Sequence, residues 1–162
     1  MKRLSVLILA FSLSLFIMVS CNSSSNEQLS SQIDSLKNQM KAAYIPGTGE
    51  IMNSIVQPHH YKLWLAGQKQ NWTLAEYERH QLLGGFKRIE KYHKGTPEAA
   101  AVPMIYPEMK AVEIAISQKD EKAFNNHFVL LTNMCNTCHQ ATKYEFNVIS
   151  VPTVTNFGNQ HF

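Results

Sequence analysis

Residues 120–142 read DEKAFNNHFVLLTNMCNTCHQAT, and this stretch decides the fold that we expect. Its apolar and cysteine side chains recur at steps of three and four residues, which is the spacing of one face of an α-helix. Six positions keep this register: Phe124, Phe128, Leu131, Cys135, Cys138 and Thr142. Asp120 precedes them and has the short carboxylate side chain that caps helix N-termini. We therefore predict a long helix that begins after Asp120 and carries both cysteines in its regular register.

The region before this helix also has helical periodicity, and no convincing run alternates as β-strands do. We predict a helix over residues 50–68, with a kink near Ser54 to Pro58 because Pro58 lacks a backbone N–H. Gly84 and Gly85 are expected inside the next helix, where glycine lowers stability. Such a pair indicates close approach of a bulky group, either a neighbouring helix or a cofactor.

Two more helices and a tail complete the expected domain. The helix that contains Gly84 and Gly85 is predicted to start at the capping box of Thr73 and Glu76. A proline-rich connection is expected over residues 96–106, and Pro107 suits the first turn of a short helix. Residues 146–162 are expected to lie over the body as an extended tail. The predicted fold is all-α, most simply an antiparallel four-helix bundle.

The chemistry-bearing motif lies near the end of the last helix. Residues 135–139 read Cys-Asn-Thr-Cys-His, the C-x-x-C-H signal for attachment of a c-type haem. Residues three apart share a helix face, so Cys135 and Cys138 can both form thioethers with the haem vinyl groups. His139 follows directly and can serve as an axial ligand to the iron. The motif therefore predicts one covalent haem c.

Two other uses of a cysteine pair are less consistent with this sequence. A zinc site needs a second pair of ligands, and Cys21 is the one other cysteine in the chain. A thioredoxin-like redox pair needs a βαβ setting, which the helical periodicity does not provide.

The chain begins with the signature of an export signal. Lys2 and Arg3 are basic, residues 4–19 are apolar apart from three serines, and a polar stretch follows. Residues 18–21, Met-Val-Ser-Cys, resemble a bacterial lipobox. This resemblance predicts removal of residues 1–20 and lipidation of Cys21, and an ordinary secreted protein is the alternative. A lipidated protein would be anchored in the cell envelope and would face the periplasm.

Residues 21–48 are expected to link this anchor to the domain formed by residues 49–162. The linker contains a short helical seam that comprises Leu29, Ile33, Leu36 and Met40. The seam is barely two heptads long, which favours packing on its own domain, with a homodimer as the alternative. Without Lys2 and Arg3, the 15 basic residues become 13 against 12 acidic ones. This balance gives no indication of nucleic-acid binding.

A helical domain with C-x-x-C-H in its last helix resembles the cytochrome c prime family and its low-spin relatives. That family has a basic residue four positions after the haem histidine, and Lys143 stands there. The resemblance implies a role for Lys143 beside the haem. The family's tyrosine three positions after the histidine is replaced by Thr142. Residues 59–76 also resemble a block that recurs in small exported bacterial haem proteins.

The second axial ligand has three candidates in the helix over residues 50–68. Met52 matches the position that either ligates or blocks the iron in relatives of cytochrome c prime. His60 lies in the recurring block, and His59 is the weaker candidate. Each has a structural alternative, because methionine fills gaps in apolar cores and a histidine after a proline can bond to a freed carbonyl. The other histidines, His80, His93, His127 and His161, are expected to be surface or core residues.

Two functions follow from the state of that second axial position. A filled position favours an electron carrier that exchanges electrons with redox partner proteins. An open position favours binding or sensing of a small gas ligand, as the family resemblance allows. A haem enzyme is less favoured, because no acid–base group stands out beyond the histidines already named.

Overall fold

The computed structural model describes residues 26–40, 43–153, 160 and 162. The export signal, Cys21 and His161 lie outside these residues. The chain divides into two compact units, Met1–Tyr44 and Ile45–Phe162. In the first unit, residues 26–40 form a helix that contains the expected seam. Among the described residues, no helix is both long enough and apolar enough to span a membrane.

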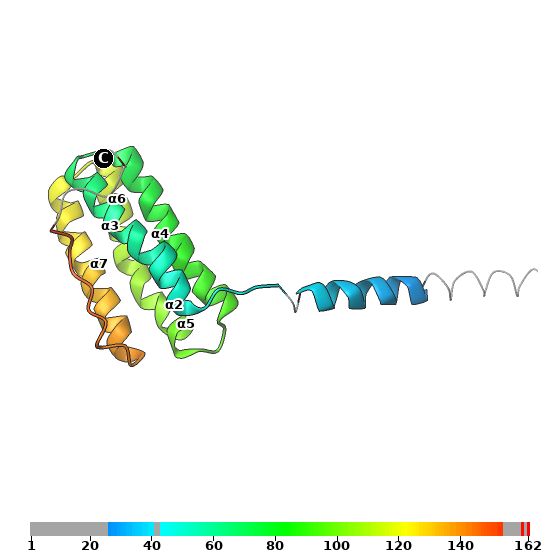
Figure 1. Cartoon of the computed structure of the whole chain (residues 1–162). Helices are drawn as coiled ribbons and strands as arrows, with labels where there is room; N and C mark the ends of the chain where they lie inside the picture. Colours follow the sequence, from blue (N-terminus) through cyan, green and yellow to red (C-terminus); the bar gives the residue numbers. More distant parts are fainter. Residues whose placement is uncertain (1–25, 41–42, 154–159, 161) are drawn as a thin grey trace, which may run out of the picture. The chain divides into compact units, whose positions relative to one another are not determined.

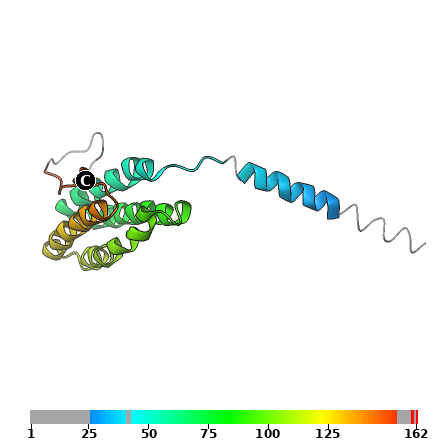
Figure 2. The same cartoon turned by 90° about the horizontal axis from the view of Figure 1, so that it is seen from below.

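The second unit is built from helices, and the described residues contain no β-strand, which confirms the all-α prediction. Its elements in chain order are α2 (Thr48–Ile51), the π-helix η1 (Met52–Val56), α3 (Gln57–Gln68), α4 (Trp72–Tyr92), α5 (Pro97–Ala101), the 3₁₀-helix η2 (Val102–Ile105), α6 (Tyr106–Gln118) and α7 (Glu121–Ala141). Helix α3 packs on α4 and α7, and α6 packs on the same two helices (Figures 1 and 2).

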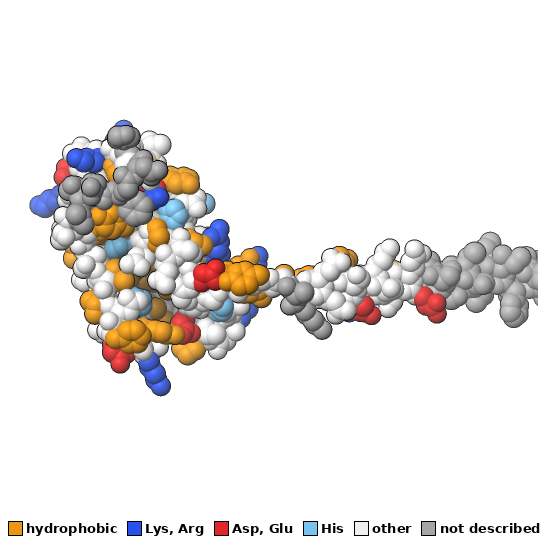
Figure 3. Space-filling view, in the orientation of Figure 1, with side chains coloured by type: hydrophobic (Ala, Val, Ile, Leu, Met, Phe, Trp, Pro, Cys, Tyr) orange, Lys and Arg blue, Asp and Glu red, His pale blue; other side chains and the backbone are white. Residues whose placement is uncertain are grey.

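The core lies between these four long helices. Phe124, Phe128 and Leu131 of α7 are fully buried, as the register of the last helix predicted. The rings of Phe124 and Phe128 meet the Trp64 ring of α3, with 4.9 Å between the ring centroids of Trp64 and Phe128. Most visible lysine and arginine side chains of this unit lie toward the margin of the face in Figure 3. Helix α7 therefore contributes its apolar face to the core, where it packs on α3 and α6.

A π-helical turn lies just before Pro58, where the sequence predicted a kink. Helices α2, η1 and α3 follow one another without a break, and η1 occupies the residues just before Pro58. Pro58 has no N–H to donate to the carbonyl four residues earlier, so the regular α-helical pattern is interrupted there. The Ser54 hydroxyl donates to the Glu50 carbonyl at 2.6 Å. A π-helical turn thus lies in the region of the predicted kink, and Met52 is its first residue.

The predicted start of α4 is wrong. Asn71 caps the helix, because its side-chain oxygen accepts a hydrogen bond from the Leu74 N–H at 3.2 Å. Glu76 does not complete a capping box with Thr73 and instead binds the Arg79 guanidinium, with 2.7 Å between Arg79 Nε and Glu76 Oε2. The helix therefore starts two residues earlier than a cap at Thr73 would allow.

The expected connection over residues 96–106 is also wrong. Most of it is helical, forming α5 and η2, and α6 begins at Tyr106. The Thr96 hydroxyl accepts a hydrogen bond from the Ala99 N–H at 3.2 Å and caps α5. Pro97 and Pro103 each lie in the first turn of a short helix, where a missing N–H costs no helical hydrogen bond. Pro107 lies in the first turn of α6, as predicted.

Gly85 of α4 allows η1 to approach closely. A Cβ atom on Gly85 would lie 2.8 Å from Val56 Cγ2 and 3.1 Å from Ile55 Cγ2, whereas one on Gly84 would meet no atom within 4 Å. The structure thus favours helix packing as the reason for Gly85. This contact fixes η1, and with it Met52, against the middle of the domain.

Candidate functional site

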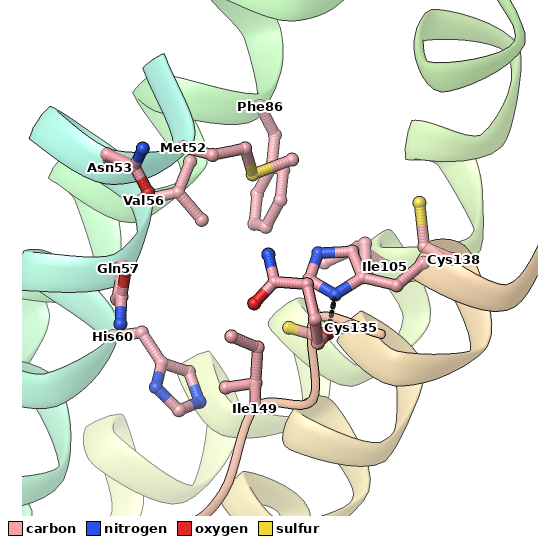
Figure 4. Close-up of a pocket in the computed structure, with 12 residues that line it drawn as sticks. Met52, Asn53, Val56, Gln57, His60, Phe86, Ile105, Cys135, Cys138 and Ile149 are labelled. Carbon is pink, nitrogen blue, oxygen red and sulfur yellow. Dashed lines mark hydrogen bonds between the residues drawn. The ribbon is translucent and has the colours of Figure 1, made fainter. Parts of the chain in front are cut away.

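One pocket brings most of the predicted site residues together. Its empty space, including the part open to solvent, is about 500 Å³, and Cys135, Cys138 and His139 of α7 form one wall. Met52 and His60 lie on the opposite wall, which η1 and α3 form (Figure 4).

Apolar side chains and the tail close the rest of the pocket. Phe86 of α4 and Ile105 of η2 line it, as do Asn147 and Ile149 from the tail. A second pocket, of about 750 Å³, shares Met52 and His139 with the first and does not include His60. The apolar lining and the few polar groups are typical of a cofactor site.

Both cysteines are buried free thiols on α7. Burial raises the pKa of the Cys135 thiol to about 12. Burial, and to a lesser degree the charge of Glu98, also raises the pKa of Cys138. Both groups are therefore neutral at physiological pH, and a neutral thiol is a poor nucleophile and a poor metal ligand. Within the described residues, no three His, Cys, Asp or Glu side chains form a cluster that could hold a metal ion.

The end of α7 turns the chain back over this pocket. The Tyr144 N–H donates to the His139 carbonyl at 2.7 Å, and the Lys143 N–H donates to the Gln140 carbonyl at 3.3 Å. This pair of bonds is a Schellman motif, in which the residue after the cap adopts a left-handed conformation. Lys143 fills that position with φ of 66°. Its side chain is exposed and lines neither pocket, so the structure does not bring it to the candidate haem site.

His139 is oriented by the tail. Its Nδ1 lies 2.5 Å from the carbonyl oxygen of Asn147. A carbonyl oxygen only accepts hydrogen bonds, so Nδ1 carries the proton of the neutral ring. The lone pair is then on Nε2, the other ring nitrogen. This tautomer is the one that leaves Nε2 able to bind a metal.

His60 is held inside the protein. It is 4% exposed, and its ring packs on Phe128 with 4.5 Å between centroids. The Thr132 hydroxyl donates to the Phe128 carbonyl and therefore accepts from His60 Nε2, at 2.9 Å in both cases. Burial lowers the pKa of His60 to about 4, so the ring is neutral at physiological pH.

His59 points elsewhere. Its Nδ1 lies 2.5 Å from Oε2 of Glu78, a carboxylate side chain that is 1% exposed. His59 lines neither pocket. Its geometry is that of a partner to a buried carboxylate.

The remaining described histidines have surface or structural positions, as the sequence indicated. His93 lies 2.9 Å from the Pro46 carbonyl through Nε2, and His127 lies 3.1 Å from Glu108. His80 is exposed.

Met52 is the candidate that shares both pockets with His139. Its thioether extends over the pocket toward the Phe86 ring, from the side opposite Cys138 (Figure 4). The structure thus places Met52 and His60 in one pocket with His139 and leaves His59 outside it.

Sequence reasoning missed the contribution of the tail. Asn147 and Ile149 line the pocket, and Asn136 binds the Ile149 backbone. Backbone carbonyls leave no trace in a sequence, and residues 146–150 show no motif. The chain matches no protein family model, no curated protein and no solved structure.

Proposed function

We propose that this protein is a monohaem c-type cytochrome that transfers electrons. Haem c would be attached through Cys135 and Cys138, with His139 as an axial ligand. The observation that carries the proposal is the contact between His139 Nδ1 and the Asn147 carbonyl oxygen. Two free thiols and an available Nε2 share one apolar pocket, and that nitrogen is freed by the bond from Nδ1 to Asn147.

The residues present fit this cofactor. A haem needs at most two protein ligands for its iron, because the porphyrin provides four nitrogens. The protein therefore does not need a cluster of three metal-binding side chains. When bound, haem supplies a one-electron redox centre, and the protein controls its ligation, orientation and surroundings.

Contacts between α3 and α7 support an antiparallel arrangement. His60 meets Thr132, and further toward the end of α3 Gln68 meets Asn125. In two antiparallel helices, the numbers of facing residues have a nearly constant sum. This sum is 192 or 193 for the two pairs, so the residue that faces His139 from the first of these helical segments is about residue 53. With the remaining helix contacts, this order supports the proposal of an antiparallel four-helix bundle.

The same register favours Met52 over His60 as the second axial ligand. Met52 lies within about one residue of the level of His139. His60 lies at the level of Thr132, seven residues away, which is about 10 Å along a helix at 1.5 Å per residue. We therefore propose axial ligation by His139 and Met52, with His60 as a neutral wall residue.

A filled sixth position favours electron transfer, because the iron can change oxidation state with little rearrangement. We further propose that the protein works on the periplasmic side of the cell envelope. The export signal and the lipobox-like Cys21 support a lipid-anchored carrier whose partners are redox proteins.

Expression of the full chain with c-type maturation machinery tests the proposal. Covalent haem should remain on the denatured wild-type chain and be lost from the double variant Cys135→Ser/Cys138→Ser. Optical and EPR spectra should be low-spin, with little change on addition of carbon monoxide. Absence of covalent haem from the wild type would refute the proposed function.

The axial assignment is tested by Met52→Ala and His60→Ala. We expect the first change alone to convert the spectrum to high-spin and to permit carbon monoxide binding. A high-spin wild type that binds carbon monoxide readily would instead support the gas-binding alternative. If His60→Ala alone produced the change, the register argument would be wrong.

A further inference from the structure

The tail segment formed by residues 144–151, here called the tail strap, is fastened directly to the C-x-x-C-H motif. The Asn136 side chain donates from Nδ2 to the Ile149 carbonyl and accepts from the Ile149 N–H, at 2.8 Å in both cases. This two-point contact resembles the pairing of one residue with its partner in a β-ladder. Asn136 therefore holds the backbone of the strap against α7 through a side chain located between the two cysteines.

The strap has a consistent inside and outside. Ile149 and Val151 pack on the core, whereas Phe146 and Val148 are 80% and 73% exposed. Two fixed points bracket the residue that meets His139. The Schellman motif fixes the strap at Tyr144, and Asn136 fixes it at Ile149. The Asn147 carbonyl lies between these points and is thereby held 2.5 Å from His139 Nδ1.

We propose that Asn136 is a positioning residue that sets the electronic character of His139 through the tail strap. A histidine ligand that donates its second N–H to a carbonyl is a stronger electron donor to the metal than one without that bond. Stronger donation stabilises the oxidised iron and lowers the reduction potential. Loss of the Asn136 contacts should release the strap, weaken the bond from His139 to Asn147, and raise the potential.

This inference rests on the proposed function, because the potential is that of a haem ligated by His139. The neighbouring Thr137 provides a matched control. It also lies between the two cysteines, but its hydroxyl donates to the Asn133 carbonyl at 3.0 Å within α7. Thr137→Ala should therefore alter the same motif without affecting the strap.

The test compares full-length wild type, Asn136→Ala, Asn136→Asp and Thr137→Ala, each loaded with haem and kept in detergent. Asn136→Asp retains an acceptor for the Ile149 N–H but loses the donor to the Ile149 carbonyl, so it guards against a misfolded alanine variant. The midpoint potential is measured by spectroelectrochemical titration. The rate of proteolytic cleavage within residues 144–151 is measured on the same samples and on the haem-free chains.

Both Asn136 variants should show faster cleavage of the strap, and Asn136→Ala should also have a more positive potential. The carboxylate of Asn136→Asp lowers the potential by its own charge, so this variant is judged by cleavage alone. Thr137→Ala should match the wild type in both. The inference is overturned if the strap loosens without a change in potential, if neither quantity changes, or if Thr137→Ala shifts the potential equally. Failure of the proposed function has a different signature, because no variant would then carry covalent haem. The cleavage of the haem-free chains would still report whether Asn136 holds the strap.

Discussion

Replacing Gly85 of α4 by alanine should destabilise the protein, whereas replacing its neighbour Gly84 should stabilise it. Both residues lie inside α4, so alanine at either position gains about 1 kcal/mol in helix propensity. At Gly84 the new methyl group meets no atom within 4 Å. The whole gain should therefore appear as an increase in the free energy of unfolding.

At Gly85 the same gain is opposed by a collision with η1. The new Cβ atom would lie 2.8 Å from Val56 Cγ2, below the separation that packed carbon atoms adopt. Val56 is β-branched and has little rotamer freedom in a helix, so its side chain cannot turn aside. Overpacking of this kind costs about 1–3 kcal/mol. Gly85→Ala should thus be less stable than Gly84→Ala by about that amount, with a net effect between neutral and about 2 kcal/mol destabilising.

Urea denaturation followed by helical circular dichroism measures both free energies of unfolding. A second readout comes from the site, because Val56 lines the pocket and belongs to the same π-helical turn as Met52. Gly85→Ala should perturb the haem spectrum, and Gly84→Ala should leave it unchanged. Equal stability of the two variants would refute the close approach of α4 to η1 and reopen a direct role of Gly85 at the cofactor.

Three further predictions follow from hydrogen bonds of buried or capping groups. The pKa of His60 is about 4 in the folded chain and 6.5 in the unfolded chain. Between these two pH values the unfolded chain binds a proton that the folded chain does not bind. The haem-free wild type should therefore lose about 3 kcal/mol of stability as the pH falls from 6.5 to 4. Denaturation at several pH values tests this, with His60→Gln expected to have a shallower dependence. His59→Ala should leave the Glu78 carboxylate buried without this partner and cost about 3 kcal/mol, a loss that Glu78→Gln should partly reverse in a double-mutant cycle. Asn71→Ala should cost about 1 kcal/mol and Thr73→Ala much less, and the opposite order in urea denaturation would contradict the observed cap.

The sequence predicted the parts of the fold that depend on local signals. The register from Phe124 to Cys138 and the cap at Asp120 are confirmed, because burial and capping act within one helix. Thr73 failed as a cap although its spacing to Glu76 was correct. Asn71 is an equally good capping residue two positions earlier, and Arg79 binds the Glu76 carboxylate instead. Where two local capping signals compete, other neighbours three residues away decide between them, and a single motif does not show which one forms.

For the candidate site too, the sequence predicted the parts that depend on local signals. Cys135, Cys138 and His139 form a contiguous motif, and the structure brings them to one pocket with Met52 and His60. The sequence could not rank Met52 and His60, because their ranking depends on the register between two helices. The haem, the lipid at Cys21 and electron transfer remain predictions.

The tail shows why a motif alone leaves a site incomplete. C-x-x-C-H specifies which atoms can bind a haem, but it does not specify the tautomer or the orientation of the histidine. In this chain those properties depend on a backbone carbonyl eight residues later, and that carbonyl is held by a Schellman turn on one side and by the Asn136 amide on the other. Thus Asn136, one of the two residues between the cysteines that the motif leaves open, carries part of the site's geometry. The motif around His139 does not reveal this effect of Asn136, because Asn136 acts through the tail that folds back over α7.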